Sequence, residues 1–305
     1  MGFWNDVGNA ISDAADAVTG AVSSAANTVV DAVTTAVGAV VTTLESTVGI
    51  LVDAIGFVVG LVFSVPVLGR FLNELLDLVY TVLYFILSLG DFVLTLIGVT
   101  FEKRMKLCVI IQRDEKGNPI TDSSAVDPYV QFAINAYKRQ ANIRVLPDAL
   151  FVYASAFDGP PHASDAYIDV DSGNSSSTTL DVRCEGVVWA RDLTTSGSAF
   201  NWMMIRDCFW GNGRRLLGYG APIAAIAVRK FTDGDEGCAL GWAADYVTVD
   251  FSGDSSTLAH EMGHACNLWH VSDPSNLMIH QAPHPAKLTR FQAAMVRASR
   301  HVTFF

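Results

Sequence analysis

Apolar positions recur every eleven residues through the first part of the chain, residues 5–65. Three such rows occur, and one of them consists of Val7, Val18, Val29, Val40, Leu51 and Val62. Eleven residues over three turns correspond to about 3.67 residues per turn, close to the period of an undistorted α-helix. The rows therefore align as one nearly straight apolar stripe, faced by Ser, Thr, Asn, Asp and Gly. We predict a long amphipathic helix over residues 1–69.

This helix has three interpretations. Small apolar residues with a weakly charged polar face are typical of helices that lie on membrane lipid. The same stripe suits self-association through residues 1–100 in a slightly right-handed bundle, and it equally suits a helix that covers the rest of the chain. The first basic residue is Arg70, so electrostatic attraction to anionic lipid is not expected.

Residues 70–104 form a second, more apolar region. A helix is predicted over 71–99, long enough to cross a bilayer, with polar residues recurring every seven positions: Glu74, Thr81, Ser88 and Thr95, and Asp77, Tyr84 and Asp91. Paired with the apolar segment 48–68, it predicts a hydrophobic hairpin that inserts in a membrane and buries the polar stripe against a partner helix or a water-filled lumen. The basic residues of 102–106 place this end on the cytoplasmic side. A soluble hairpin shielded by partners is the alternative.

From residue 105 the pattern becomes that of an ordinary mixed domain. Strands are predicted at 107–112, 143–145, 150–154, 166–170, 222–228, 238–244 and 246–250. Helices are predicted from Asp127-Pro128 to about 140, after the N-cap segment 254–257, and over 288–300. The last helix has Phe291, Met295 and Val296 on one face, which we expect to pack beneath the site. The fold class is therefore α+β over residues 105–305, preceded by the long apolar and amphipathic helical region.

Charge and cysteine content narrow the class of protein. The net charge is −11, and residues 1–101 hold nine acidic residues against one basic residue. An acidic chain without a basic cluster argues against nucleic acid as a partner. Five scattered cysteines allow one or two disulfides without fixing the pairing. The first residues lack the basic region and apolar core of a cleavable signal, so we expect a protein that is membrane-associated, or secreted or translocated without one.

The strongest chemical signal is the segment His260-Glu261-Met262-Gly263-His264. On a helix, His260 and His264 leave the same face one turn apart and are able to bind one tetrahedral Zn²⁺ ion. Glu261 is the candidate general base, because it lies beside the first ligand without binding the metal. A sharp turn at Asn267, in a left-handed conformation, returns His270 as the third ligand. Three protein ligands with one open position indicate a catalytic site.

These residues resemble the metzincin clan of zinc endopeptidases, whose motif is H-E-x-x-H-x-x-G-x-x-H followed by a methionine turn. Asn267 stands where the family has Gly. The resemblance implies a metzincin-like domain with a twisted mixed sheet, a zinc helix and a C-terminal helix. It also implies that Met278 is a hydrophobic floor beneath the metal. The substrate edge strand falls on Ala239, Leu240, Gly241 and Trp242.

One more histidine has a suggested role. His280 occupies the place where astacin-like and serralysin-like members have a Tyr near the metal. A His there is able to donate a hydrogen bond to the transition-state oxyanion; the alternative is a plain loop residue.

The predicted activity is zinc-dependent hydrolysis of peptide bonds in a peptide or protein substrate, by a metal-activated water with Glu261 as base. The N-terminal helical region then tethers or delivers this domain at a membrane. Two alternatives are open. One is a membrane-inserting or pore-forming toxin or effector whose N-terminal helices translocate the domain. The other is an inactive metal-binding assembly protein.

Overall fold

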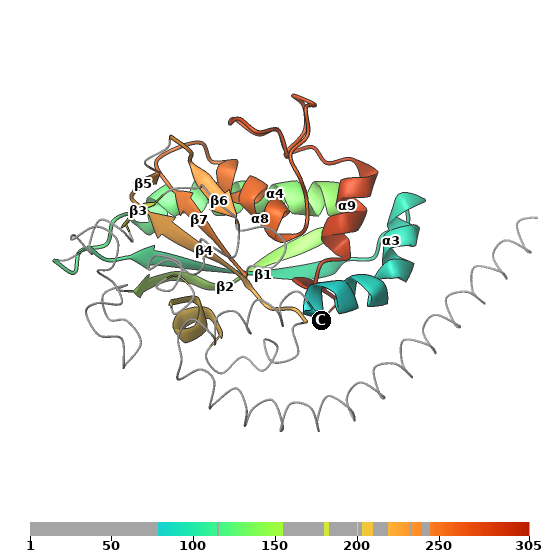
Figure 1. Ribbon diagram of the computed structural model, residues 1–305, viewed down its shortest axis with the longest axis horizontal. Coiled ribbons are helices and arrows are strands. Elements are labelled where there is room, and N and C mark those ends of the chain that lie inside the picture. The colour runs from blue at the N-terminus through green and yellow to red at the C-terminus, as the bar shows by residue number, and fades with distance from the viewer. Residues whose placement is uncertain are drawn as a thin grey trace, which may run out of the picture. The chain divides into compact units, whose positions relative to one another are not determined.

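The computed structural model describes residues 79–114, 116–154, 180–182, 200, 203–209, 219–231, 234–239 and 245–304. The helix predicted over 1–69 and the apolar segment 48–68 lie outside these residues, as does the strand predicted at 166–170. The described part is a mixed α/β structure in which helices cover a mixed sheet (Figure 1).

The central sheet has the order β2-β1-β4-β7-β6. Its strands are β2 (Ile143–Ala154), β1 (Lys103–Gln112), β4 (Ile223–Val228), β7 (Tyr246–Asp250) and β6 (Gly237–Ala239). The first four are parallel, β6 is antiparallel to β7, and the short β8 (Val302–Thr303) pairs with β1. A second, two-stranded sheet joins β3 (Asp181–Val182) to β5 (Lys230–Phe231). The strands predicted at 107–112, 222–228 and 246–250 are thus confirmed.

Side chains alternate across β1 and build a core on each face of the sheet. Met105, Leu107 and Val109 join the core with helices α4 (Ser123–Ala141) and α8 (Thr257–Ala265). Cys108 and Ile110 point to the opposite core, with the π-helix η3 (Met204–Phe209). Because both faces of the sheet are covered, the central parallel strand β4 is a continuous apolar run in which every residue is buried. Figure 1 shows α4 and α8 above the sheet and the π-helix below it.

Two predicted elements differ in the structure. Helix α4 begins four residues before the predicted N-cap Asp127, because Asp122 accepts the Ala125 amide and caps it. Pro128 consequently lies inside the helix rather than at its first position. The strands predicted at 143–145 and 150–154 form one strand, β2, with irregular register against β1.

The C-terminal helix α9 (Arg290–Arg297) is shorter than predicted. It begins with a capping box between Thr289 and Gln292. Val296 is fully buried as expected, but Phe291 is exposed and touches Phe92 edge-on rather than packing beneath the site. The predicted common face of Phe291 and Val296 was therefore wrong, because positions five apart diverge on a short helix.

The helix predicted over 71–99 is broken at Ser88. Its described part consists of a helix over Val79–Leu87 and α3 (Leu89–Leu96), which meet at a bend of 57°. Within the described residues, no single helix has the length and apolarity needed to cross a bilayer, although the bent pair together passes such a test. Figure 1 shows α3 lying beside α9.

The polar stripe of this helix pair is buried within the described structure, where Asp91 faces helix α9 and strand β1; the partner helix is thus one of the same chain, and the stripe does not line a water-filled lumen. Asp91 of α3 forms a bidentate ion pair with Arg297, with its Oδ1 2.6 Å from Nη2 and its Oδ2 3.0 Å from Nε. Lys103 Nζ lies 3.1 Å from Asp91 Oδ2 and donates to the Arg297 carbonyl. Burial lowers the pKa of Lys103, and the Asp91 carboxylate opposes that shift.

A disulfide joins Cys108 of β1 to Cys208 of the π-helix, in the core on the face of the sheet opposite α4 and α8. Cys238 is also disulfide-bonded, and Cys266 is a free, buried thiol. Burial raises the pKa of Cys266 to about 12, so this thiol stays protonated and unreactive. The sequence left the disulfide pairing open, and the fold determines it by bringing Cys108 and Cys208 together in the core.

Candidate metal centre

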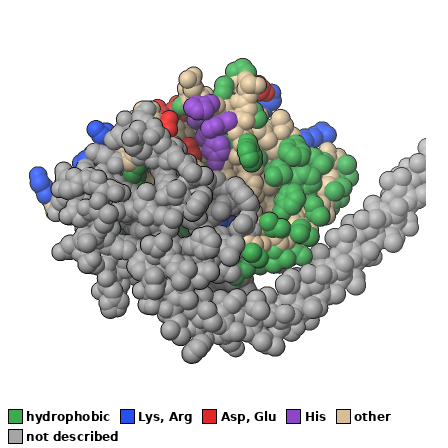
Figure 2. Space-filling view, viewed as in Figure 1, with side chains coloured by type: hydrophobic (Ala, Val, Ile, Leu, Met, Phe, Trp, Pro, Cys, Tyr) green, Lys and Arg blue, Asp and Glu red, His purple; other side chains and the backbone are tan. Residues whose placement is uncertain are grey.

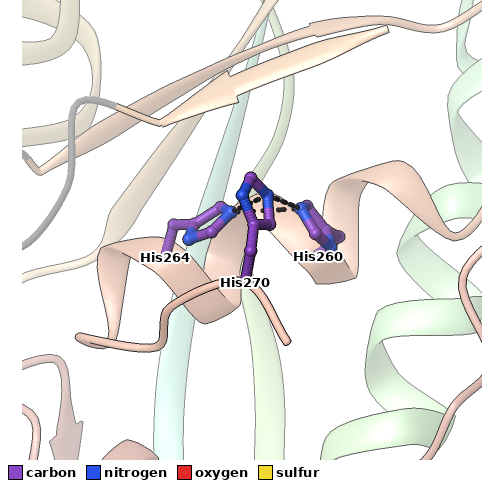
Figure 3. A group of neighbouring side chains, drawn as sticks. All are labelled: His260, His264 and His270. Carbon is purple, nitrogen blue, oxygen red and sulfur yellow. Dashed lines mark hydrogen bonds between the residues drawn. The ribbon is translucent and has the colours of Figure 1, made fainter. Parts of the chain in front are cut away.

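Three imidazoles converge at one end of α8. His260 and His264 project from the same face of the helix, and His270 returns from the following loop (Figure 3). Their Nε2 atoms lie 3.1 Å apart for His260 and His264, 3.0 Å for His264 and His270, and 3.2 Å for His260 and His270. The three residues predicted as ligands are thus brought together as one possible metal site.

This arrangement fits a tetrahedral metal ion. Zinc–nitrogen bonds of about 2.0–2.1 Å place tetrahedral ligand atoms about 3.3 Å apart, close to the spacing seen here. His260 Nδ1 is 2.8 Å from the Leu277 carbonyl, and His264 Nδ1 is 2.8 Å from the Leu268 carbonyl. Because each Nδ1–H donates to a backbone oxygen, each Nε2 keeps its lone pair toward the common centre.

Burial keeps the three imidazoles neutral. Desolvation, followed by the neighbouring His264, lowers the pKa of His260 to about 2. Desolvation lowers the pKa of His264 to about 4, and the pKa of the less buried His270 shifts in the same direction. A metal competes with protons for these nitrogens, so neutral rings are ready to coordinate at pH 7.

The turn that returns His270 has the predicted left-handed residue. Asn267 has φ 70°, and its amide donates to the His264 carbonyl. The Leu268 amide donates to the Gly263 carbonyl, which completes a Schellman motif at the end of α8. The same turn directs the Leu268 carbonyl to His264 Nδ1. This one turn therefore ends the helix, reverses the chain and orients the His264 ring.

The methionine turn packs directly against α8. Met278 is fully buried, and a Cβ at Gly263 would lie 2.6 Å from its sulfur, so only a glycine admits it there. The Val271 amide donates to the Met278 carbonyl, which ties the strand after His270 to this turn. Asn276 accepts from the Met278 amide and exchanges side-chain hydrogen bonds with Gln292 of α9. Helix α9 thus supports the turn through Gln292.

Glu261 is buried next to His260 on α8, where a general base is expected. Its side chain packs against the edge strand β6: a Cβ at Gly237 would lie 2.7 Å from Glu261 Oε1 and 2.6 Å from the Thr257 methyl group. The start of α8 is fixed by Glu236, which accepts from the Asp254 amide and the Thr257 hydroxyl. Sequence reasoning missed Gly237, because its role depends on a contact with a residue 24 positions away.

Two further histidines surround the ligands. The ring of His280 lies 4.7 Å from that of His270 and is exposed, so it is near the centre as the resemblance implied. His284 is buried and stacks on His260, with ring centroids 4.0 Å apart. No spacing in the sequence links His284 to the other rings. The His284 ring therefore lines the candidate metal centre beside His260.

The predicted edge strand is described only at its beginning. Ala239 closes β6, whose partner is β7, and β6 is the last strand of the sheet order. Leu240, Gly241 and Trp242 lie outside the described residues. Gly237, two residues before Ala239, contacts Glu261, so the described end of this edge passes beside the candidate base.

Comparisons with known proteins give distant likenesses. No family model matches the chain, and neither does any curated protein. Among solved structures, metalloproteinase-II from Bacteroides fragilis has a TM-score of 0.35 and 13% identity, covering 69% of this chain and 61% of that chain. A chaperone–substrate complex also has a TM-score of 0.35 and 13% identity, covering 66% and 38%. The chain spans less than two thirds of either protein, and the chemistry rests on the side chains described above.

Proposed function

We propose that this chain is a zinc-dependent endopeptidase of the metzincin type. The observation that carries the proposal is the convergence of three neutral imidazole nitrogens beside a buried glutamate. Three imidazoles with a free fourth position are a ligand set of catalytic zinc. The buried Met278 and the left-handed Asn267 support the same assignment, because Met278 falls in the methionine turn of the motif and Asn267 adopts a left-handed conformation where the motif has Gly.

An extended peptide is the substrate that this architecture suits. Strand β6 ends the described sheet, and a peptide is able to add to such an edge through main-chain hydrogen bonds. We assign this role to Ala239, Leu240, Gly241 and Trp242. Because β6 packs against Glu261 through Gly237, a peptide on this edge runs past the base. Strand addition therefore positions a peptide bond near the imidazoles.

His260, His264 and His270 would hold the zinc ion, which when bound would lower the pKa of water and polarise a carbonyl. Glu261 accepts the proton of the attacking water on its carboxylate and then donates it to the leaving nitrogen. Gly237 leaves room for this carboxylate beside β6, since a Cβ there would lie 2.7 Å from Glu261 Oε1. His280 is near enough to the ligands to donate to the developing oxyanion.

The test is the Glu261→Gln variant of the full chain. We expect it to bind one zinc per chain, measured by elemental analysis, and to lose peptide hydrolysis by about 10²–10⁴-fold, which is the usual contribution of a general base. A library of quenched fluorescent peptides supplies the substrates. Retained turnover in this variant removes Glu261 as the base. The control is His280→Phe, which keeps zinc and is expected to lose less activity.

A protein that binds zinc but cleaves no peptide in its unaltered form is instead a metal-binding assembly protein. The library therefore separates the proposal from that second reading. Cleavage by the unaltered chain that a chelator abolishes, and that added zinc restores, supports the endopeptidase.

A further inference from the structure

The helix pair over Val79–Leu87 and α3 is inverted relative to a helix on a water-soluble surface. Its polar side chains Thr81, Ser88 and Thr95 are buried, and the Asp91 side chain is only 8% exposed. Its outward positions are apolar and are 44–68% exposed at Val82, Ile86, Leu89, Val93 and Ile97. Figure 2 shows the corresponding hydrophobic patch on the molecular surface, apart from the histidine cluster.

This outward surface, which we call the apolar face, extends beyond the helix pair. Phe101 is 59% exposed just after α3, and Phe291 of α9 is 58% exposed and touches Phe92. Soluble surfaces rarely carry a contiguous apolar patch without a partner. An apolar face built from two elements therefore indicates an interaction surface.

The distribution of charged residues indicates which kind of partner covers this face. Between residues 79 and 101 the sequence holds one Asp, Glu, Lys or Arg, namely Asp91. That carboxylate turns inward to Arg297 and Lys103, so no formal charge of this segment faces outward. Protein partners are usually recognised through a polar rim around an apolar centre. A segment with no outward charge instead matches the hydrocarbon side of a lipid interface.

Part of the chain before the face has the same character. Residues 54–69 contain no Asp, Glu, Lys or Arg, while Arg70, Glu74 and Asp77 lie between them and Val79, where the described structure begins. The described part of each arm of the bent pair is about 13 Å long at 1.5 Å per residue, shorter than a hydrocarbon core of about 30 Å, although the two arms together pass a length and composition test for a bent span. A bent pair with one apolar side suits a position along the interface, with that side immersed about 5–10 Å.

We propose that the apolar face docks on a lipid bilayer, with the helix pair lying in the plane of the interface. The Asp91 ion pairs hold the helices to the sheet domain, so docking brings the histidine cluster to the membrane with it. Because the helix pair carries no Lys or Arg, its contribution to binding is expected to be equal on phosphatidylcholine and on phosphatidylserine-containing vesicles, and insensitive to salt. The proposal is independent of the proposed peptidase activity.

The test uses the full chain with an environment-sensitive nitrobenzoxadiazole label on Ile86→Cys. The matched control carries the label on Arg139→Cys, an exposed position of α4. Adding phosphatidylcholine vesicles is expected to shift the emission of the label at 86 to the blue and to expose it to quenchers within the bilayer. The label at 139 is expected to stay in water. The Glu261→Gln chain labelled at 86 is expected to respond like the chain with Glu261 intact.

A second variant measures the contribution of the face to affinity. Val82→Gln, Ile86→Gln and Val93→Gln together keep good helix formers at exposed positions. They are expected to weaken vesicle partitioning roughly 100-fold, because each side chain is 50–56% exposed and its replacement therefore removes about half of one side chain's apolar transfer. Unchanged partitioning assigns binding to residues outside the described part and overturns the proposal.

Three other outcomes also overturn it. A chain that does not bind vesicles has no lipid-docking face. A blue-shifted label at 86 without vesicles, at every protein concentration, means that another segment of the same chain covers the face. A shift that grows with protein concentration, with dimers in analytical ultracentrifugation, means that a second copy covers it.

Discussion

Helices α8 and α3 both bury polar side chains, but for opposite purposes. In α8 the buried His260 is neutral, and its Nε2 atom faces two other nitrogens at the candidate metal centre. In α3 the buried Asp91 faces two cations of the domain on which the helix docks. The first arrangement leaves capacity to bind a ligand, while the second satisfies the charge completely. Buried polarity alone therefore does not locate a site; unused coordination capacity does.

The two helices also differ in whether their apolar side chains are buried or exposed to solvent. The apolar residues Leu258, Ala259 and Met262 of α8 all enter the core. The apolar residues Val93 and Ile97 of the α3 region remain exposed. Exposed apolar surface of this size costs solubility, so its retention indicates a second surface with a role of its own.

Removing a metal ligand is expected to abolish the function of α8. His264→Ala takes away one of the three converging nitrogens, and zinc affinity should fall by more than the ~10–100-fold that losing a supporting hydrogen bond costs. Equilibrium dialysis with elemental analysis measures this loss. His280→Ala is the matched control, because His280 is close to His270 but outside the trio. Loss of zinc in the control as well would place His280 among the ligands.

Neutralising Asp91 is expected to destabilise the attachment of α3 to the rest of the described structure. Asp91→Asn leaves Lys103 and Arg297 buried without a counter-charge, and such losses cost about 3–5 kcal/mol of unfolding free energy. Urea denaturation followed by circular dichroism measures it. Glu102→Gln is the control, since it breaks the exposed ion pair with Lys138, where solvent screening leaves little to lose. Equal stability of the Asp91→Asn and unaltered chains would mean that the ion pairs do not hold α3 in place.

The sequence predicted the metal centre better than the docking of α3, and the reason is distance along the chain. His260, His264, Asn267 and His270 lie within eleven positions, so helix geometry and one turn determine how they meet. The seven-residue recurrence of polar residues likewise revealed a stripe on the helix. It did not reveal what the stripe contacts, because Arg297 lies 206 positions from Asp91.

Supporting residues of the site were missed for the same reason. Gly237 and His284 contact Glu261 and His260 only because the sheet and a loop bring them there. The start of α4 was misplaced by a local ambiguity, since Asp122 and Asp127 are both good N-cap residues and Pro128 favoured the second. Local rules rank such candidates without deciding between them.

Acid is expected to weaken the metal-free protein through the buried rings. An unfolded histidine binds a proton below pH ~6.5, whereas the pKa values of His260 and His264 are about 2 and about 4 in the folded chain. The unfolded state therefore binds more protons, so stability falls as pH decreases from about 6.5 towards 4. Urea midpoints at pH 7.5 and pH 5, in chelator, measure this. His264→Ala should show a smaller pH dependence; an unchanged one would assign the effect to His301, whose pKa burial also lowers to about 4.

A side chain at Gly237 is expected to affect catalysis without affecting the metal. In Gly237→Ala the added Cβ meets Glu261 Oε1 and the Thr257 methyl group, so the carboxylate must shift. Misplacing a catalytic group by about 1 Å costs as much as 10²-fold in rate. We expect kcat to fall by about 10-fold or more with unchanged zinc content. Gly234→Ala is the control, because open space surrounds Gly234 although its positive φ adds strain. Equal activity of both variants would show that β6 does not position Glu261.

The smallest effect is expected at Asn267, and it tests whether the turn after α8 is strained. A residue with φ 70° favours glycine, and an alanine there costs about 1–2 kcal/mol. Asn267→Gly should therefore match or slightly exceed the stability of the unaltered chain, and Asn267→Ala should fall below it, in urea denaturation of the metal-free protein. Neither change removes a ligand, so both variants should bind zinc, with Asn267→Ala weaker because the turn also directs the Leu268 carbonyl to His264. If alanine were tolerated as well as glycine, the left-handed turn would not be what returns His270. The ring would then be held by the Val271–Met278 hydrogen bond, which comes from outside the helix.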